Sequence, residues 1–521
     1  MTSILKTVMN SNLFFLIIPL ILSTYTHLWN PLGFPADPSY DENIYLRRTM
    51  NILNNLGPQE SELYDHPYFL QIFLGGILLF IGYPNSLHPI IGNVVSIHML
   101  YLVPKLIMGI LSIVDTFLIY KIAECYYDKN YNGDIEDNSH IRIAFVASIL
   151  FAAMPITSMV RTVWLESVQL PFLLSSILFA IHAKKGSVRE VSCRNNTNNR
   201  NLIILTLLSG IFLGLSIFTK MPAFTFITLV GYLLFSSISK ISKRNLKTVI
   251  FWLITVFAIP SIWPLYALSL GRLNLWLKGI FFQTHRNVQS FLNSIKYDFF
   301  IDPVFLTIGF AGFVVTGIIK RDLLILLWVI PFMMFLYVIG FVSYWHLIPI
   351  FPVLSIAAAK MINDLSNVAI ITRKENKKNI QQIVPFIVVS GIAIFGILNT
   401  TKLITEKTNV NNPYFEAAAF VVKYLHDNYH NKFTVISNPF YSWIPFYVFN
   451  IHYDSIDYYD SPVSIKTKKV ILISDPVLTD RLNHNMVDKS IKKYLFGADK
   501  VLTFDDKNSY TNNKVVIYIH Q

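Results

Sequence analysis

The sequences Pro35–Arg48, PADPSYDENIYLRR, and Glu62–Phe69, ELYDHPYF, belong to the first long polar stretch of the chain. This stretch follows a single apolar run and contains two acidic clusters, Asp41 with Glu42 and, further on, Asp65. Most of the remaining chain is apolar. The position of these carboxylates between apolar segments is therefore informative about both the fold and the function.

Helix capping is one explanation of these acidic residues. Ser39 and Glu42 have the S-x-x-E spacing of a capping box, in which the glutamate reaches back to the start of its own helix. Asp65 followed by His66 and Pro67 similarly fits an N-cap with proline in the first turn. A functional site is the other explanation, and the placement of the remaining charges favours it.

Composition indicates a polytopic membrane protein. The 521 residues are 53% hydrophobic and 14% charged, whereas a soluble domain carries about 25% charged residues. The mean hydropathy is +0.48. The net charge of +12 comes mostly from Lys and Arg in short loops between apolar runs, a pattern of membrane topology rather than of nucleic-acid binding. Only Cys125 and Cys193 are present, both in predicted inner loops, so no disulfide framework is expected.

The apolar runs predict about eleven transmembrane helices. The first, Leu13–Leu28, lacks a small-x-small cleavage site after it and is therefore interpreted as a span rather than a signal peptide. Tyr40–Leu56 predicts an amphipathic helix at the membrane surface. Phe69–Tyr83 is shorter than the roughly 20 residues needed to span, so it is expected to be interfacial or re-entrant. Ten longer runs follow: Met99–Ile122, Ile141–Met159, Val163–Ala183, Asn201–Thr219, Pro222–Ser239, Val249–Leu270, Pro303–Ile319, Leu323–Val342, Leu347–Ile362 and Ile383–Leu398.

The basic loops predict the orientation. Lys and Arg concentrate at 184–200, 240–247, 320–321 and 373–378, and all four segments lie on one side if the N-terminus is cytoplasmic. We therefore expect a multi-pass protein of the plasma membrane with an extracytosolic C-terminal part. The expected division is a transmembrane domain over residues 1–399, with a first outer loop at about 30–98, and a soluble domain over 400–521.

The C-terminal segment has the composition of a small α/β domain. Tyr414–Leu425 has helical spacing of apolar residues. Short β-rich runs follow at Thr434–Ile436, Val470–Ile473, Val501–Phe504 and Val515–Ile519. This segment contains no phosphate loop, metal-ligand spacing or nucleophile elbow.

The predicted topology places the conspicuous polar residues on one membrane face. These are Asp41, Glu42, Asp65, His66, Arg161, Glu166, Lys220, His285, Arg286 and His346. Several also have structural explanations: Lys220 can extend to the membrane surface, Arg161 can pair with Glu166, and His346 can be an interfacial polar group. Their concentration at one face nevertheless suits a site for an anionic, lipid-borne substrate.

Several motifs resemble those of the GT-C glycosyltransferases, most closely the branch of the dolichyl-phosphate-mannose protein mannosyltransferases and the aminoarabinose transferases. DENIYL and YDHPYFLQIFLGGILLFIGYP resemble its first outer loop, where an Asp-Glu pair follows the first helix and His-Pro opens the next segment. AFVASILFAAMPITSMVRTVWLESVQLPFLL resembles its third and fourth helices, with Pro155, Arg161 and Glu166 at the characteristic positions. SGIFLGLSIFTKMPAF, which contains Lys220, and WHLIPIFPVLSIAAAK resemble later helices.

The resemblance covers roughly residues 10–400. This chain departs from the family pattern at Glu166, where Asp is common, and at Tyr68, which replaces the second proline of His-Pro-Pro. The soluble segment matches no domain of the family.

The resemblance implies transfer of a sugar from a polyprenyl (dolichyl) phosphate to an acceptor hydroxyl of a protein, glycan or lipid on the extracytosolic face. An attacking hydroxyl must lose its proton, so a positioned carboxylate is required. Asp41, with Glu42 beside it, is the expected catalytic residue, and single displacement with inversion is expected. The expected donor-phosphate and substrate-binding residues are His66, Arg161, Glu166, Lys220, Asp65, His285, Arg286 and His346, whose cations would stabilise charge on the leaving phosphate.

No cofactor is certain. A divalent cation, Mg or Mn, at Asp41 or Glu42 is an open alternative that no ligand spacing supports.

Two other classes of protein also stay open. A transporter or lipid-linked-sugar flippase would suit the intramembrane Lys105 and Asp115, although no internal repeat is evident. An oligosaccharyltransferase is the other alternative, and the chain lacks a WWD-type motif.

Overall fold

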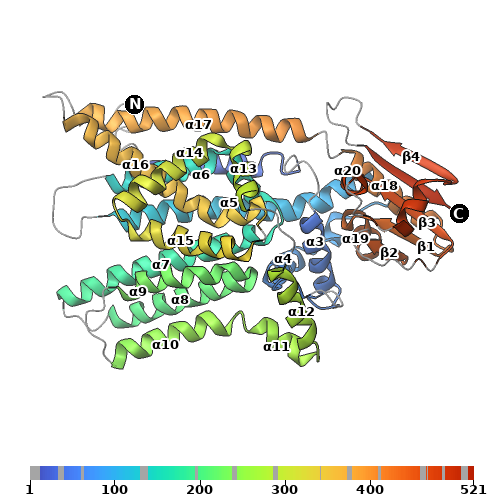
Figure 1. Ribbon diagram of the computed structural model, residues 1–521, viewed down its shortest axis with the longest axis horizontal. Coiled ribbons are helices and arrows are strands. Elements are labelled where there is room, and N and C mark those ends of the chain that lie inside the picture. The colour runs from blue at the N-terminus through green and yellow to red at the C-terminus, as the bar shows by residue number, and fades with distance from the viewer. Residues whose placement is uncertain are drawn as a thin grey trace.

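The structure is a computed structural model. It describes residues 12–32, 40–59, 64–128, 139–193, 198–236, 243–285, 291–340, 342–371, 378–408, 412–457, 465, 467–483, 487, 489–505 and 514–521. A bundle of long helices occupies one end of the molecule and a small domain containing a β-sheet occupies the other (Figure 1). The short helices α3, α4 and α12 lie between these two parts.

The helical part begins with α2 and ends with α17. Its helices are α2 (Asn12–Leu28), α3 (Tyr40–Leu53), α4 (Phe69–Phe80), α5 (Val94–Tyr127), α6 (Ser139–Ala153), α7 (Leu165–Cys193), α8 (Asn198–Thr219), α9 (Ile227–Phe235), α10 (Lys243–Ala258), α11 (Ile262–Ser269), α12 (Leu273–Thr284), α13 (Phe291–Ile301), α14 (Pro303–Gly312), α15 (Leu323–Ile339), α16 (Phe351–Ile371) and α17 (Lys378–Thr408). The short helical segments between them are η1 (Asn85–Leu87), η3 (Pro155–Arg161), η4 (Met221–Phe226), η5 (Phe313–Ile319) and η6 (Tyr344–Ile350).

Within the described residues, five helices are long and apolar enough to cross a membrane, or up to eight if each of three bent pairs is one span. The expected count of eleven is therefore not confirmed. The bends share one feature, a proline in the break or directly after it, and proline cannot donate the hydrogen bond that would continue the preceding helix. Pro155 lies at the 73° bend after α6, Pro260 at the 48° bend between α10 and α11, and Pro303 at the 117° bend between α13 and α14.

The outer surface of the bundle is apolar, as expected for contact with lipid. Exposed side chains include Phe80, Phe257, Leu265, Phe300, Tyr337 and Val338. Inside, small residues allow close helix packing. A Cβ at Gly312 would lie 2.5 Å from the backbone of Ala357 in α16, so only glycine permits this approach. The structure thus supports an integral membrane protein.

One smaller expectation about segments is corrected. Cys125 and Cys193, expected in loops, lie in the last turns of α5 and α7, because both helices continue beyond their apolar runs. α17 ends at Thr408 and so runs across residue 400, where the boundary of the soluble domain is expected. The division into two domains stays a prediction.

The C-terminal part is a five-stranded mixed sheet with helices, as the sequence predicts for an α/β domain. Its strands are β1 (Phe433–Ser437), β2 (Asp454–Asp457), β3 (Lys469–Ser474), β4 (Lys500–Phe504) and β5 (Val515–His520), in the order β2-β1-β3-β5-β4. β1 is parallel to β2 and β3, whereas β5 is antiparallel to β3 and β4. The helices are α18 (Asn412–Asp427), α19 (Pro439–Tyr447), α20 (Pro476–Asn483) and α21 (Lys489–Lys492), with the short η8 (Lys493–Leu495). β1 and β3 are almost entirely buried and form the centre of the domain.

Candidate functional site

The Asp-Glu pair of the first polar stretch lies on α3, which presents a different set of contacts on each of three faces. Asp41 and Glu42 occupy its first turn, where carboxylates stabilise the positive end of the helix dipole. Residues three or four positions apart share a face of a helix. The face of Asp41 therefore also carries Tyr45 and Arg48.

This first face of α3 lies against the segment around His66. Arg48 pairs with Asp65 at 2.9 Å, and the rings of Tyr45 and His66 are 6.4 Å apart. Burial would raise the pKa of the Asp65 carboxyl, but Arg48 and then His66 outweigh it and hold the pKa below its ordinary value. The predicted N-cap role of Asp65 is wrong. α4 is preceded instead by Tyr68, which makes no side-chain cap bond, and Asp65 is held by the arginine.

Tyr45 connects this face to the other predicted site residues. It is almost fully buried. Burial raises its pKa, and the carboxylates of Asp41, Asp65 and Glu166 raise it further, while Arg48 lowers it. Three predicted site residues from separate parts of the sequence are therefore close enough to act on one phenol.

The second face of α3 carries Glu42, which is fully buried. Its carboxylate pairs with Lys105 of α5 at 3.4 Å and accepts a hydrogen bond from the backbone N–H of Val163 at 3.4 Å. Lys105 is thus a partner of the acidic cluster rather than an isolated charge of a transport pathway. The capping box with Ser39 falls partly outside the described residues.

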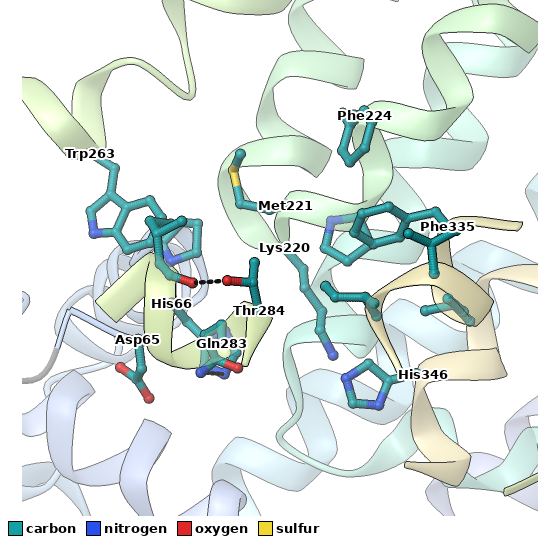
Figure 2. Close-up of a pocket in the computed structure, with 16 residues that line it drawn as sticks. Asp65, His66, Lys220, Met221, Phe224, Trp263, Gln283, Thr284, Phe335 and His346 are labelled. Atoms are coloured by element: carbon teal, nitrogen blue, oxygen red, sulfur yellow. Dashed lines mark hydrogen bonds between the residues drawn. The ribbon is translucent and has the colours of Figure 1, made fainter. Parts of the chain in front are cut away.

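A cavity of about 490 Å³ lies beside this cluster (Figure 2). Its walls come from the His66 segment, the start of η4, α12 and the end of α15. Figure 2 shows His66 and Gln283 on one side of the cavity, with Lys220 and His346 on the other. The residues that line it are Asp65, His66, Pro67, Lys220, Met221, Pro222, Phe224, Trp263, Ile280, Gln283, Thr284, Phe335, Leu336, Val338, Ile339 and His346. Most of the lining is apolar, and the few polar groups converge from both sides.

Lys220 and Glu166 form a buried ion pair at one end of the cavity. Gln169, one turn after Glu166 in α7, donates from Nε2 to the carbonyl of Lys220 at 3.0 Å. The pair explains why a lysine is tolerated at a buried helix end, since a buried charge requires a partner. Lys220 is therefore not simply extending to the membrane surface.

Arg161 does not pair with Glu166 as the structural explanation proposed. It is fully buried, and its guanidinium donates to the carbonyls of Thr26, Trp29 and Asn30 at 3.0–3.3 Å. These are carbonyls at and just beyond the end of α2, which no later turn of the helix satisfies. Arg161 thus ties η3 to the end of the first helix and does not line the cavity.

The histidines differ in their placement. The Nε2 atom of His66 is 3.4 Å from Gln283 Nε2, and His346 Nδ1 accepts a hydrogen bond from the N–H of Ser343 at the start of η6. Both histidines line the cavity. His285 is exposed, stacks on Phe281 and does not line it. Arg286 lies outside the described residues.

Asp41 and Glu42 are not among the described residues that line the cavity. Asp41 is connected to it through the shared face of α3. Trp263, Gln283 and Tyr45 belong to the site but were missed from the sequence, because an isolated Trp, Gln or Tyr has no motif spacing to mark it. A group of three or more His, Cys, Asp and Glu side chains suited to a metal is not found within the described residues, and the possible cation at Asp41 or Glu42 stays a prediction.

No protein-family model and no curated protein sequence matches the chain. Several solved structures do match it. ArnT from Cupriavidus metallidurans in the apo state superposes with a TM-score of 0.56 at 11% identity, covering 97% of each chain. The same protein bound to undecaprenyl phosphate gives a TM-score of 0.55 with the same identity and coverage.

The oligosaccharyltransferase of Archaeoglobus fulgidus, tethered to an acceptor peptide, gives a TM-score of 0.51 at 14% identity. This match covers 85% of the present chain but only 63% of the oligosaccharyltransferase. The three structures superpose on this chain over most of its length, and ArnT matches it over nearly the whole length. The chain therefore has the fold of the GT-C glycosyltransferases, which is the fold that the motifs of its first outer loop indicate.

Proposed function

We propose that this protein is a membrane glycosyltransferase that moves a sugar from a polyprenyl phosphate to an acceptor hydroxyl on the extracytosolic face. The observation that carries the proposal is the composition of the cavity. Apolar side chains of α12, α15 and η4 line most of it, whereas Lys220, His66, His346 and Gln283 converge at its polar end. This arrangement fits an amphipathic donor, with the hydrocarbon against the apolar wall and the phosphate near the cations.

The binding partners of the structural relatives support the same donor class. ArnT has been solved with undecaprenyl phosphate and the archaeal oligosaccharyltransferase with dolichol phosphate. In the present chain, Lys220 supplies the positive charge that stabilises the leaving phosphate. His66 and His346 supply hydrogen bonds from either side.

Asp41 is the proposed general base. A hydroxyl that attacks the anomeric carbon must transfer its proton to a carboxylate within hydrogen-bonding reach. Glu42 is committed to Lys105, and Asp65 is committed to Arg48. The resemblance of the DENIYL motif to the first outer loop of the GT-C family assigns this role to Asp41, which lies in the first turn of α3. The proposed reaction is a single displacement with one base, which inverts the anomeric centre.

The structure favours an enzyme over a transporter in one respect. Lys105, the most suggestive intramembrane cation, is tied to the acidic cluster of α3 and so serves the site. Localisation in the plasma membrane, with a cytoplasmic N-terminus, forms part of the proposal, as does an acceptor that is a protein, glycan or lipid.

The experiment is a donor screen with the purified full-length protein. Radiolabelled polyprenyl-phosphate sugars are supplied one at a time, together with a membrane extract as the acceptor source. The proposal expects one donor to be consumed with release of polyprenyl phosphate, and expects the Asp41→Asn protein to consume none at a comparable rate. If no donor is consumed and polyprenyl phosphate does not raise the melting temperature, the proposal is wrong.

A further inference from the structure

The third face of α3, formed by Asn43, Arg47 and Asn51, lies against the C-terminal domain. α19 packs on α3, and α18 packs on α5. The hydroxyl of Tyr447 in α19 donates to the side chain of Asn51, near the end of α3. The C-terminal domain therefore contacts the helix that carries the predicted base.

A buried chain of hydrogen bonds makes a second contact at the start of α3. The indole N–H of Trp443 donates to the hydroxyl of Tyr101 at 2.8 Å, and this hydroxyl donates to Asn43 Oδ1 at 2.7 Å. All three side chains are buried, with exposed fractions of 0%, 2% and 0%. Tyr101 belongs to α5. This series of hydrogen bonds therefore links the C-terminal domain, the long helix α5 and the first turn of α3.

Aromatic packing fixes the ring of Tyr101. The ring stacks on Phe440 of α19 with centroids 4.8 Å apart, and makes edge contacts with Phe415 and Trp443 at 5.6 and 5.4 Å. The ring is thereby held with its hydroxyl 2.7 Å from Asn43 Oδ1, and the carbonyl oxygen of Phe440 is a second, longer acceptor at 3.1 Å. Hydrogen bonds in such a low-dielectric, closely packed setting hold geometry more firmly than exposed ones.

The ion pair between Lys105 and Glu42 holds the same end of α3. Lys105 follows Tyr101 by four residues and lies on the same face of α5. Tyr101 binds Asn43 and Lys105 binds Glu42, so two consecutive residues of α3 are attached to one face of α5. Rotation of α3 would break both contacts, and it would also move Asp41, which directly precedes them.

We infer that Trp443 and Tyr101 are positioning residues through which the C-terminal domain sets the orientation of α3, and so aims the Asp41 carboxylate toward the donor cavity. The catalytic consequence rests on the proposed function. The structural part of the inference, that the C-terminal domain holds α3 through these hydrogen bonds, does not depend on the proposed function. A small displacement of a reacting group is costly, since about 1 Å of misplacement can reduce a rate by about 100-fold.

The test removes the hydrogen bonds and keeps an aromatic ring at each position, with Tyr101→Phe, which loses only the hydroxyl, and Trp443→Phe, which exchanges the indole for a smaller ring, in the full-length protein. Both variants should turn over the donor about 10-fold more slowly, while the dissociation constant for polyprenyl phosphate stays within about twofold. In hydrogen exchange, the amides of α3 should exchange faster, while those of β1 and β3 stay protected.

The matched control is Tyr424→Phe, which deletes a hydroxyl of the same domain that bonds to Gln521 away from α3. It should leave both turnover and α3 exchange unchanged. Wild-type turnover in the two test variants, unchanged α3 exchange, or a parallel loss of donor binding would each overturn the inference. If the wild-type protein consumes no donor, the proposed function fails, and α3 exchange alone decides whether the domain holds the helix.

Discussion

Asp41 has two possible roles that predict different results for one substitution. As a partner of the helix dipole, its carboxylate contributes about 0.3–1 kcal/mol of stability, and Asp41→Asn leaves the rate nearly unchanged. As the general base, its loss lowers the rate by about 10²–10⁴, because asparagine cannot accept the proton. We expect the second result, with binding of polyprenyl phosphate retained. Sugar transfer by the purified variant, beside a thermal melt, distinguishes the two roles.

Glu42→Gln is the comparison for Asp41→Asn. It removes the neighbouring carboxylate, which pairs with Lys105, and leaves that lysine buried without its anion. A loss of thermal stability is expected, and any fall in turnover should be smaller than that of Asp41→Asn. If Glu42→Gln abolishes turnover in a folded protein while Asp41→Asn does not, the base is Glu42.

The buried pair of Lys220 and Glu166 predicts competition for the lysine. A donor phosphate that binds Lys220 must share this cation with the Glu166 carboxylate. Glu166→Gln should therefore bind polyprenyl phosphate about tenfold more tightly, although the free protein melts at a lower temperature because Lys220 loses its partner. The measurement is the ligand-induced shift in melting temperature.

Lys220→Met is the counterpart and should weaken binding of the same lipid. Weaker binding in Glu166→Gln would show instead that the carboxylate holds Lys220 in place for the phosphate. Unchanged binding in both variants would remove the pair from the donor site.

At the scale of elements, the ion pair of Arg48 and Asp65 joins α3 to the segment before α4 and makes stability depend on pH. The folded-state pKa of Asp65 is below its ordinary value of about 3.9. Its ionised form therefore stabilises the protein above pH 3.9, and this contribution is lost as the pH falls through the folded-state pKa. Asp65→Asn should lower the melting temperature at neutral pH and should lose less stability than the wild type on acidification below about pH 4.

Melts between pH 3 and 7 check this pH dependence. Glu416→Gln, which changes an exposed carboxylate on α18, should follow the wild-type curve. Wild-type acid sensitivity in Asp65→Asn would contradict the assignment.

Local patterns predicted the elements better than their ends or their contacts. β1, β3, β4 and β5 were found because they are rich in β-branched and apolar residues. β2, with the sequence DSID at the edge of the sheet, was missed because a polar edge strand lacks that signal. Two of the three broken helices were predicted as the continuous runs Ile141–Met159 and Val249–Leu270, since hydropathy does not register a bend at proline.

The partners of the site residues could not be predicted from the sequence. Glu166 and Lys220 are 54 positions apart, and Glu42 and Lys105 also belong to different elements. Their pairing is set by how the helices pack. The sequence proposed the site residues and the membrane face on which they are expected, and the structure supplied the pairings of Glu42, Asp65, Glu166 and Lys220.

At the scale of the molecule, the basic loops predict that the C-terminal domain is extracytosolic. Tyr429 is exposed on this domain, so Tyr429→Cys, in a chain whose Cys125 and Cys193 are replaced by Ser, provides one accessible thiol. A membrane-impermeant thiol reagent should label it in intact cells. Labelling only after permeabilisation would reverse the orientation and place the site on the cytoplasmic face.

The apolar wall of the cavity has a kinetic consequence. Val338 lines the cavity and is also exposed at the outer surface of α15, close to exposed Tyr337. A donor that enters past these side chains diffuses in the plane of the bilayer and does not pass through bulk water. The encounter is then two-dimensional, so the rate follows the mole fraction of donor among the surrounding lipids. Adding inert lipid or detergent at a fixed bulk donor concentration should slow the reaction by surface dilution alone.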